Sequence, residues 1–253
     1  FSHVTTKVTS LESQTRIIDM ITGTGFTMEG YPYRSLFSID YRGLNENGIP
    51  TIINEAGELT TSGINFQSRT LDYLKYEGPT DPTITGSFGN MFTYKGWHLN
   101  VFMTYSFGNV VRLDPAFYAV YSDLSAMPKE FQNRWTVSGD ENIEGVVPAI
   151  ADLRQLQADS RLSYAYNAYN RSTARIAKGD FIRLKEVSLA YDFPKKWINK
   201  AKMSALSLKF QATNICLLYA DKALGGQDPE FYNAGGVATP MPRQFTLTLR
   251  IGF

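Results

Sequence analysis

The chain ends in a strict alternation of apolar and polar residues. In MPRQFTLTLRIGF, residues 241–253, Phe245, Leu247, Leu249, Ile251 and Phe253 alternate with polar residues and Gly252. Successive side chains of a β-strand point to opposite faces, so this pattern predicts a strand with one apolar and one polar face. We expect the strand to continue to the last residue.

The same alternation predicts four strands upstream, at residues 87–95, 97–107, 180–193 and 204–214. Two weaker candidates occupy residues 1–9 and 33–43.

Two local features add detail to these strands. Lys95-Gly96 alone separates the first pair, which predicts a tight hairpin. Within residues 180–193 the alternation changes phase at Lys185-Glu186. Because side chains alternate with a period of two, a shift by one residue predicts a bulge or a change of environment.

Short and long connections alternate along the chain. Residues 95–97 and 194–203 are short, whereas residues 44–86, 108–179 and 218–240 are long and rich in Gly, Pro, Asn and Asp. Outer-membrane barrels have short periplasmic turns and longer extracellular loops. If the last strand ends in the periplasm, strand parity places every long connection outside the cell.

The apolar faces carry aromatic rings near the strand ends. These rings are Trp97, Tyr105, Phe107, Tyr191, Phe193 and Phe253. Aromatic girdles flank the apolar band of membrane barrels, whereas a soluble β-sandwich favours branched aliphatic residues in its core. We therefore expect an all-β fold, an antiparallel transmembrane β-barrel. Its mid-strand residues Val101, Leu189, Leu208 and Leu249 are expected to face lipid.

Composition narrows the possible partners. The 25 Lys and Arg are scattered among 24 Asp and Glu, and the formal net charge is +1. This balance argues against nucleic acid, which is bound by a concentrated basic surface. A single cysteine, Cys216, excludes an internal disulfide and a multi-cysteine metal site. No apolar run of about 18 residues or more predicts a membrane-spanning helix, and the first residues show no signal-peptide pattern.

The sequence offers little for an enzyme. His3 and His98 lack metal-ligand spacing, and GTGFTM at 23–28 lacks the third glycine of a dinucleotide-binding fingerprint. The acids of DPE at 228–230 and DENIE at 140–144 fit solvated loop carboxylates better than a cation site. We assign no catalytic residue, no metal and no cofactor.

Substrate contact is expected in the long segment 108–179. Sugars and peptides dock on aromatic faces beside amides and carboxylates. The weak candidates are Tyr118, Tyr121, Trp135, Tyr164, Tyr166 and Tyr169. For each ring the alternative is packing within the loop or against a partner protein.

One segment resembles a known family. GDFIRLKEVSLAYDFP, residues 179–194, closely resembles a segment near the C-terminus of SusC-like (SusC/RagA family) TonB-dependent outer-membrane transporters. Further stretches resemble the family in the same order. They are GYPYRSLFSIDYRGL at 30–44, TGSFGNMFTYKGWHLNVFMTYSFGN at 85–109, RWTVSGD at 134–140, Asn214-Ile215, DPE at 228–230 and PRQFTLTLRIGF at 242–253.

The resemblance implies a large barrel in the bacterial outer membrane. It carries an N-terminal plug and a TonB-contacting segment, works with a SusD-like surface lipoprotein and imports glycans, oligosaccharides or peptides. Plugged barrels of this kind need about 22 strands. We therefore expect residues 1–253 to be the C-terminal portion of such a barrel, with residues 108–179 as an extracellular loop.

The implied partners are the rest of the barrel and its plug, the SusD-like lipoprotein, the TonB complex, the barrel-assembly machinery and the lipid bilayer. Phe253 is expected to serve as the assembly signal; the alternative is that it merely ends an apolar face. Two other functions stay open: a barrel that acts as a scaffold without importing, and a soluble β-sandwich that binds glycans.

Overall fold

The computed structural model describes residues 1–62, 64–117, 129–232 and 241–253. The chain divides into two compact units. The sheet unit comprises Phe1–Val4, Pro82–Gly108 and Gly179–Phe253, and the loop unit comprises Thr5–Asp81 and Asn109–Lys178.

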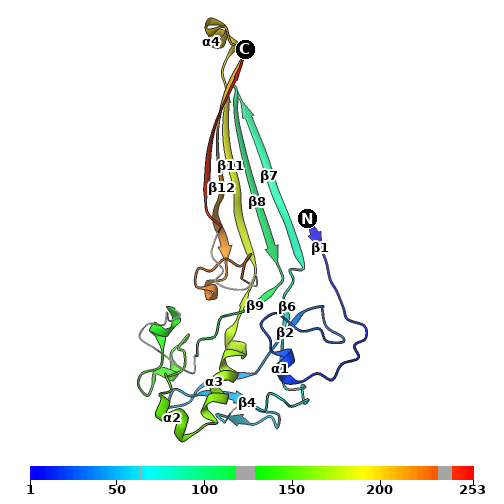
Figure 1. Cartoon of the computed structure of the whole chain (residues 1–253), viewed down its shortest axis with the longest axis vertical. Helices are drawn as coiled ribbons and strands as arrows, with labels where there is room; N and C mark the ends of the chain where they lie inside the picture. The colour runs from blue at the N-terminus through cyan, green and yellow to red at the C-terminus, as the bar shows by residue number, and fades with distance from the viewer. Residues whose placement is uncertain (63, 118–128, 233–240) are drawn as a thin grey trace. The chain divides into compact units, whose positions relative to one another are not determined.

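The sheet unit is built on one antiparallel sheet with the strand order β1-β7-β8-β11-β12-β13. Its strands are β1 (Ser2–His3), β7 (Ile84–Tyr94), β8 (Trp97–Phe107), β11 (Phe181–Asp192), β12 (Ala205–Ala220) and β13 (Gln244–Gly252). Figure 1 shows the four central strands side by side. The five strong strand predictions are confirmed, and β12 runs six residues beyond the predicted Asn214.

The β7–β8 connection is the predicted tight hairpin. Lys95 and Gly96 have φ angles of 47° and 87°, and two consecutive positive φ values are the mark of a type I′ turn. A Cβ atom at position 96 would lie 2.9 Å from the backbone oxygen of Asp192. Glycine is therefore required here by both conformation and space.

The predicted change of phase is a bulge. Leu184 pairs with Met103 of β8, but Glu186 pairs with the very next residue, Phe102, so Lys185 is the extra residue. On the other side, β12 also departs from regular pairing next to Asn214, which has a φ of 53°. Because of this extra residue, Ile182 and Leu184 before the bulge lie on the same face as Val187 and Leu189 after it.

The topology separates short from long connections. Tyr94, Trp97, Tyr191 and Leu208 are neighbours across the strands, so the β7–β8 turn and the β11–β12 connection lie at the same end of the sheet. The C-terminus and α4 (Lys195–Ile198) lie at this end too (Figure 1). The short connections thus lie at one end of the sheet, as the sequence predicts. The side of the membrane that each end faces stays a prediction.

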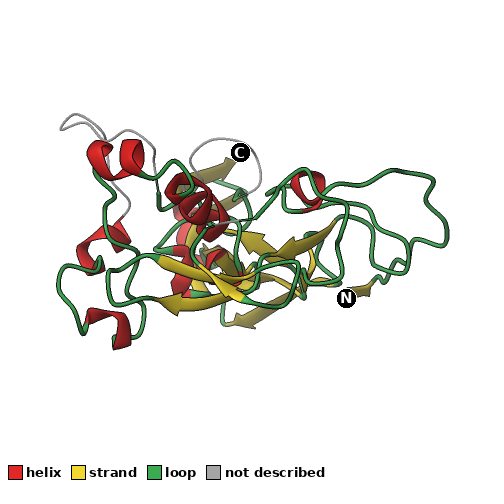
Figure 2. Ribbon diagram, turned by 90° about the horizontal axis from the view of Figure 1, so that it is seen from below, coloured by secondary structure: helices red, strands yellow, loops and turns green. Residues whose placement is uncertain are grey.

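The loop unit contains short elements. They are α1 (Ile17–Met20), β2 (Ser35–Ser38), β3 (Tyr41–Leu44), β4 (Pro50–Ile53), β5 (Leu59–Thr60), β6 (Lys75–Pro79), β9 (Val110–Arg112), α2 (Leu153–Ala158), α3 (Leu162–Asn170) and β10 (Ile176–Lys178). The weak candidate at 33–43 is two strands rather than one, and the candidate at 1–9 keeps only Ser2–His3. Loops join these elements (Figure 2).

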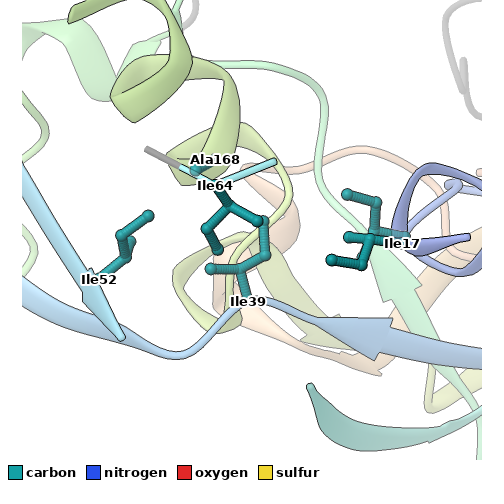
Figure 3. Packing of buried hydrophobic residues seen from close by; sticks show 6 residues of the cluster. Ile17, Ile39, Ile52, Ile64 and Ala168 are labelled. Carbon is teal, nitrogen blue, oxygen red and sulfur yellow. The ribbon is translucent and has the colours of Figure 1, made fainter. Parts of the chain in front are cut away.

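The loop unit has a hydrophobic core of its own. Ile17, Ile39, Ile52, Ile64 and Ala168 pack together and are almost fully buried (Figure 3). Four of these residues lie in the segment between β1 and β7, and Ala168 of α3 comes from the segment between β8 and β11. Two long connections of the sheet unit thus fold together into one body.

Candidate functional site

The sheet presents an apolar face that is continuous across five strands. One row runs through Phe92, Leu99, Leu189, Phe210 and Leu247, which are paired from strand to strand. Leu189 in the centre is 40% exposed and Leu247 on β13 is 69% exposed. In the sheet unit, the described residues therefore leave this face largely uncovered.

The four residues expected to face lipid all lie on this face. Val101 pairs with Val187 in the next row, and Leu208 pairs with both Tyr191 and Leu249 in the row beyond Leu189. Register thus brings them together as one apolar surface. Their contact with lipid stays a prediction.

The opposite face is mostly polar. A row of Met91, Asn100, Ser188, Gln211 and Thr246 crosses the same strands.

Phe102 is an aromatic residue on this face and breaks the alternation of β8. It lies over Gly89 of β7, where an added Cβ atom would be 3.1 Å from the ring. A glycine opposite thus gives this ring its space on the polar face.

A buried ion pair connects β11 with the segment that follows β12. Arg183 donates to Asp228 Oδ1, and its Nε lies 3.1 Å from Glu230 Oε2. Among the described residues this Nε has no hydrogen-bond partner, so its contact with Glu230 is ionic. DPE at 228–230 therefore neutralises a buried arginine, a role that the sequence did not reveal.

The other acidic motif, DENIE at 140–144, makes its contacts within its own segment. Asp140 accepts backbone N–H groups of Thr136 and Val137 at 2.9 and 3.0 Å, which lowers the pKa of its carboxyl group. Among the described residues no group of three or more His, Cys, Asp or Glu is arranged to hold a metal ion. No helix within these residues is long and apolar enough to cross a membrane.

Two of the rings proposed for substrate contact are buried in the loop unit. Tyr166 packs on Phe117 with ring centroids 4.3 Å apart, and its hydroxyl donates to the backbone oxygen of Ala149 at 2.7 Å. Tyr169 packs against Tyr41, and burial raises the pKa of its hydroxyl. With side chains 2% and 3% exposed, these two residues offer little surface to a ligand.

The remaining candidate rings differ in exposure. Trp135 is half-buried against Gly48, and its indole N–H donates to Glu141 at 2.9 Å. Tyr164 is exposed. Tyr118 and Tyr121 lie outside the described residues.

The loop unit also has a small recess that the sequence did not indicate. It measures about 170 Å³ and is lined by Met20, Met28, Tyr31, Phe37, Leu71, Asp72 and Leu74. Tyr31 and Phe37 form an aromatic cluster with Tyr76, with ring centroids 4.9 to 5.7 Å apart. The recess thus combines aromatic rings with one carboxylate, that of Asp72.

Two buried arginines connect the segments of the loop unit. Arg112 of β9 donates to Phe37 O at 2.6 Å and Ser38 Oγ at 3.1 Å. Burial lowers its pKa to about 10 although Glu77 acts in the opposite direction. Burial alone would lower the pKa of Arg175. The ion pair with Glu130 at 2.6 Å has the larger effect, so the pKa of Arg175 is raised above its ordinary value. We assign both a structural role.

Comparisons with known proteins point to TonB-dependent receptors. No known family model matches the chain. The chain is 26% identical to TonB-dependent receptor P39 of Formosa agariphila over 192 residues, 70% of this chain and 17% of that protein. It is also 26% identical to TonB-dependent receptor P3 of the same organism over 211 residues, 80% of this chain and 19% of that protein.

Solved structures agree on the fold. A structure of the RagAB peptide transporter matches with a TM-score of 0.64 at 20% identity, over 92% of this chain and 24% of the other. RagAB in the open-open state matches with a TM-score of 0.61 at 19% identity, over 92% and 23%. The resemblance to SusC-like TonB-dependent receptors is thus confirmed, and the chain spans less than a quarter of each of these four proteins.

Proposed function

We propose that the chain is part of an outer-membrane importer of nutrients, energised through TonB and assisted by a SusD-like surface lipoprotein. The observation that carries this proposal is the uncovered apolar face, continuous from β7 to β13. It is supported by relatives that are named as receptors and importers rather than enzymes.

The exposed face favours a membrane over a soluble sandwich. A sandwich covers each apolar face with a second sheet, but the described part of the sheet unit contains one sheet. Soluble proteins rarely expose contiguous apolar patches larger than about a few hundred Å². In lipid such a face is favourable, provided that the sheet closes so that its edge groups are hydrogen-bonded.

Closure requires strands beyond this chain. In the described residues β13 pairs with β12 on one side, as expected, and both ends of the sheet need partners in lipid. We propose that the remaining strands and a plug belong to the same longer protein. The chain is similar in fold to the RagAB peptide importer, and its resemblance to SusC-like transporters supports a SusD-like lipoprotein as the partner.

The recess supports peptide as the cargo class. Its lining combines the rings of Tyr31 and Phe37 with the carboxylate of Asp72, and a peptide can supply both an apolar and a cationic side chain. An apolar cavity of about 150 Å³ can hold a benzene molecule, so a recess of this size suits one apolar side chain. Asp72 at the recess favours a cationic group next to that side chain.

The function is tested in the full-length protein. We expect it in the outer-membrane fraction, released only by detergent, and we expect deletion of its TonB-contacting segment to abolish uptake of labelled peptides. Recovery in the soluble fraction would refute the membrane proposal. Unchanged uptake by the deletion variant would refute TonB-driven import and leave the scaffold function.

A further inference from the structure

One end of the sheet unit concentrates positive charge. Four lysines lie in the connection between β11 and β12, another lies in the β7–β8 turn, and an arginine lies near the end of β13. They are Lys95, Lys195, Lys196, Lys200, Lys202 and Arg250. The pairing of the strands places all three segments at the same end of the sheet.

This charge is not neutralised locally. Asp192 is the single acidic side chain among residues 94–97, 191–204 and 250–253, and its Oδ2 lies 3.0 Å from His98 Nε2. In the described part of the chain, none of the six cations has a carboxylate within 4.0 Å. The basic groups are therefore available to an external anion.

A chain of aromatic rings leads from the apolar face to these lysines. Trp97 packs on Tyr191, Tyr191 on Phe193 and Phe193 on Trp197, with ring centroids 4.6, 5.0 and 6.3 Å apart. Trp197 of α4 is 59% exposed, while the next residue, Ile198, is buried and fixes the helix. Tryptophan and tyrosine favour the membrane–water interface, where lysine extends its charge toward the headgroups.

We propose that the five lysines of this cationic end bind the phosphate headgroups of anionic glycerophospholipids in the periplasmic leaflet. The proposal rests on the membrane placement proposed above. Lipid phosphates are the anions that lie at the depth where an apolar face gives way to water, which favours them over an acidic protein. The lysines in and next to α4 then hold lipid headgroups at this end of the sheet.

The test uses the full-length protein in detergent and native mass spectrometry with added phosphatidylglycerol. Replacing Lys195, Lys196, Lys200 and Lys202 by Ser should weaken phosphatidylglycerol binding at least about tenfold, since each lysine near an anionic surface contributes measurably. Binding of phosphatidylcholine should not change. A matched pair compares K195S/K196S with K129S/K222S, which removes two exposed lysines elsewhere.

A second measurement needs no variant. Wild-type affinity for phosphatidylglycerol should fall as salt rises, because exposed charges are screened. Equal binding by both double variants, or affinity independent of salt, would overturn the proposal. Preference for lipid A over phosphatidylglycerol would place this end in the outer leaflet and also overturn it. If peptide uptake fails while lipid binding holds, the import function fails and this inference stands.

Discussion

Arg183 and Asp228 form an ion pair in which the side chains are 3% and 0% exposed. Arg183 lies on β11, and Asp228 lies in the segment after β12, forty-five residues later in the chain. A buried charge without a partner is strongly unfavourable, so each residue makes the other necessary.

Asp228→Ala should destabilise the segment 221–232 severely. Loss of one partner from a buried pair costs about 3–5 kcal/mol. We expect faster hydrogen exchange and proteolysis in this segment of the full-length protein. Asp159→Ala is the control, since Asp159 and Arg161 are exposed and such pairs contribute little. Equal protection in both variants would contradict the structural role of Asp228.

Leu189→Arg should reduce the amount of assembled barrel far more than Ser188→Arg. An arginine facing lipid at the membrane midplane costs about 2–4 kcal/mol, whereas the neighbouring position faces the polar side. Heat-modifiable migration in gels measures the folded fraction. The pair Leu249→Arg and Thr248→Arg repeats the comparison on β13, and equal tolerance on both faces would refute the lipid-facing assignment.

A protease site inserted between Asp159 and Ser160 should be cut in intact cells. These residues are exposed in the loop unit, and strand parity places residues 108–179 outside the cell. Cleavage is followed by immunoblotting with and without the lipoprotein partner. Protection in cells that lack the partner would contradict the extracellular placement.

Deletion of Phe253 should lower the amount of membrane-inserted protein with little effect on the stability of barrels that do form. The ring is 93% exposed at the end of β13, so it contributes little packing within the described residues. Surface labelling measures insertion, and thermal unfolding measures stability. Unchanged surface levels would show that Phe253 merely ends the apolar face.

Asp72→Asn should reduce uptake of peptides that place arginine beside an apolar side chain. An exposed charge pair contributes up to about 1 kcal/mol, which corresponds to at most about a fivefold effect. Peptides without a cation should be taken up as before. Asp159→Asn removes an acid elsewhere in the loop unit and should change neither. An equal loss for both peptide classes would refute the assigned charge recognition.

The sequence by itself determined the sheet. Alternation in Trp97–Phe107 and Gln244–Gly252 indicates strands because a pleated strand has a period of two, and this signal is local. Lys95-Gly96 and the phase change at Lys185 likewise predicted a turn and a bulge from adjacent residues alone.

Tertiary structure alone decided the loop unit and the contacts that join distant segments. Ile39 and Ala168 meet in one core, yet no local pattern links these two distant positions. The local sequence predicts a solvated loop acid at Asp228, whereas the fold buries this residue against Arg183. Such contacts form between residues that are far apart in the sequence, so no local pattern predicts them. Strand alternation depends on neighbouring residues and can be recognised in the sequence.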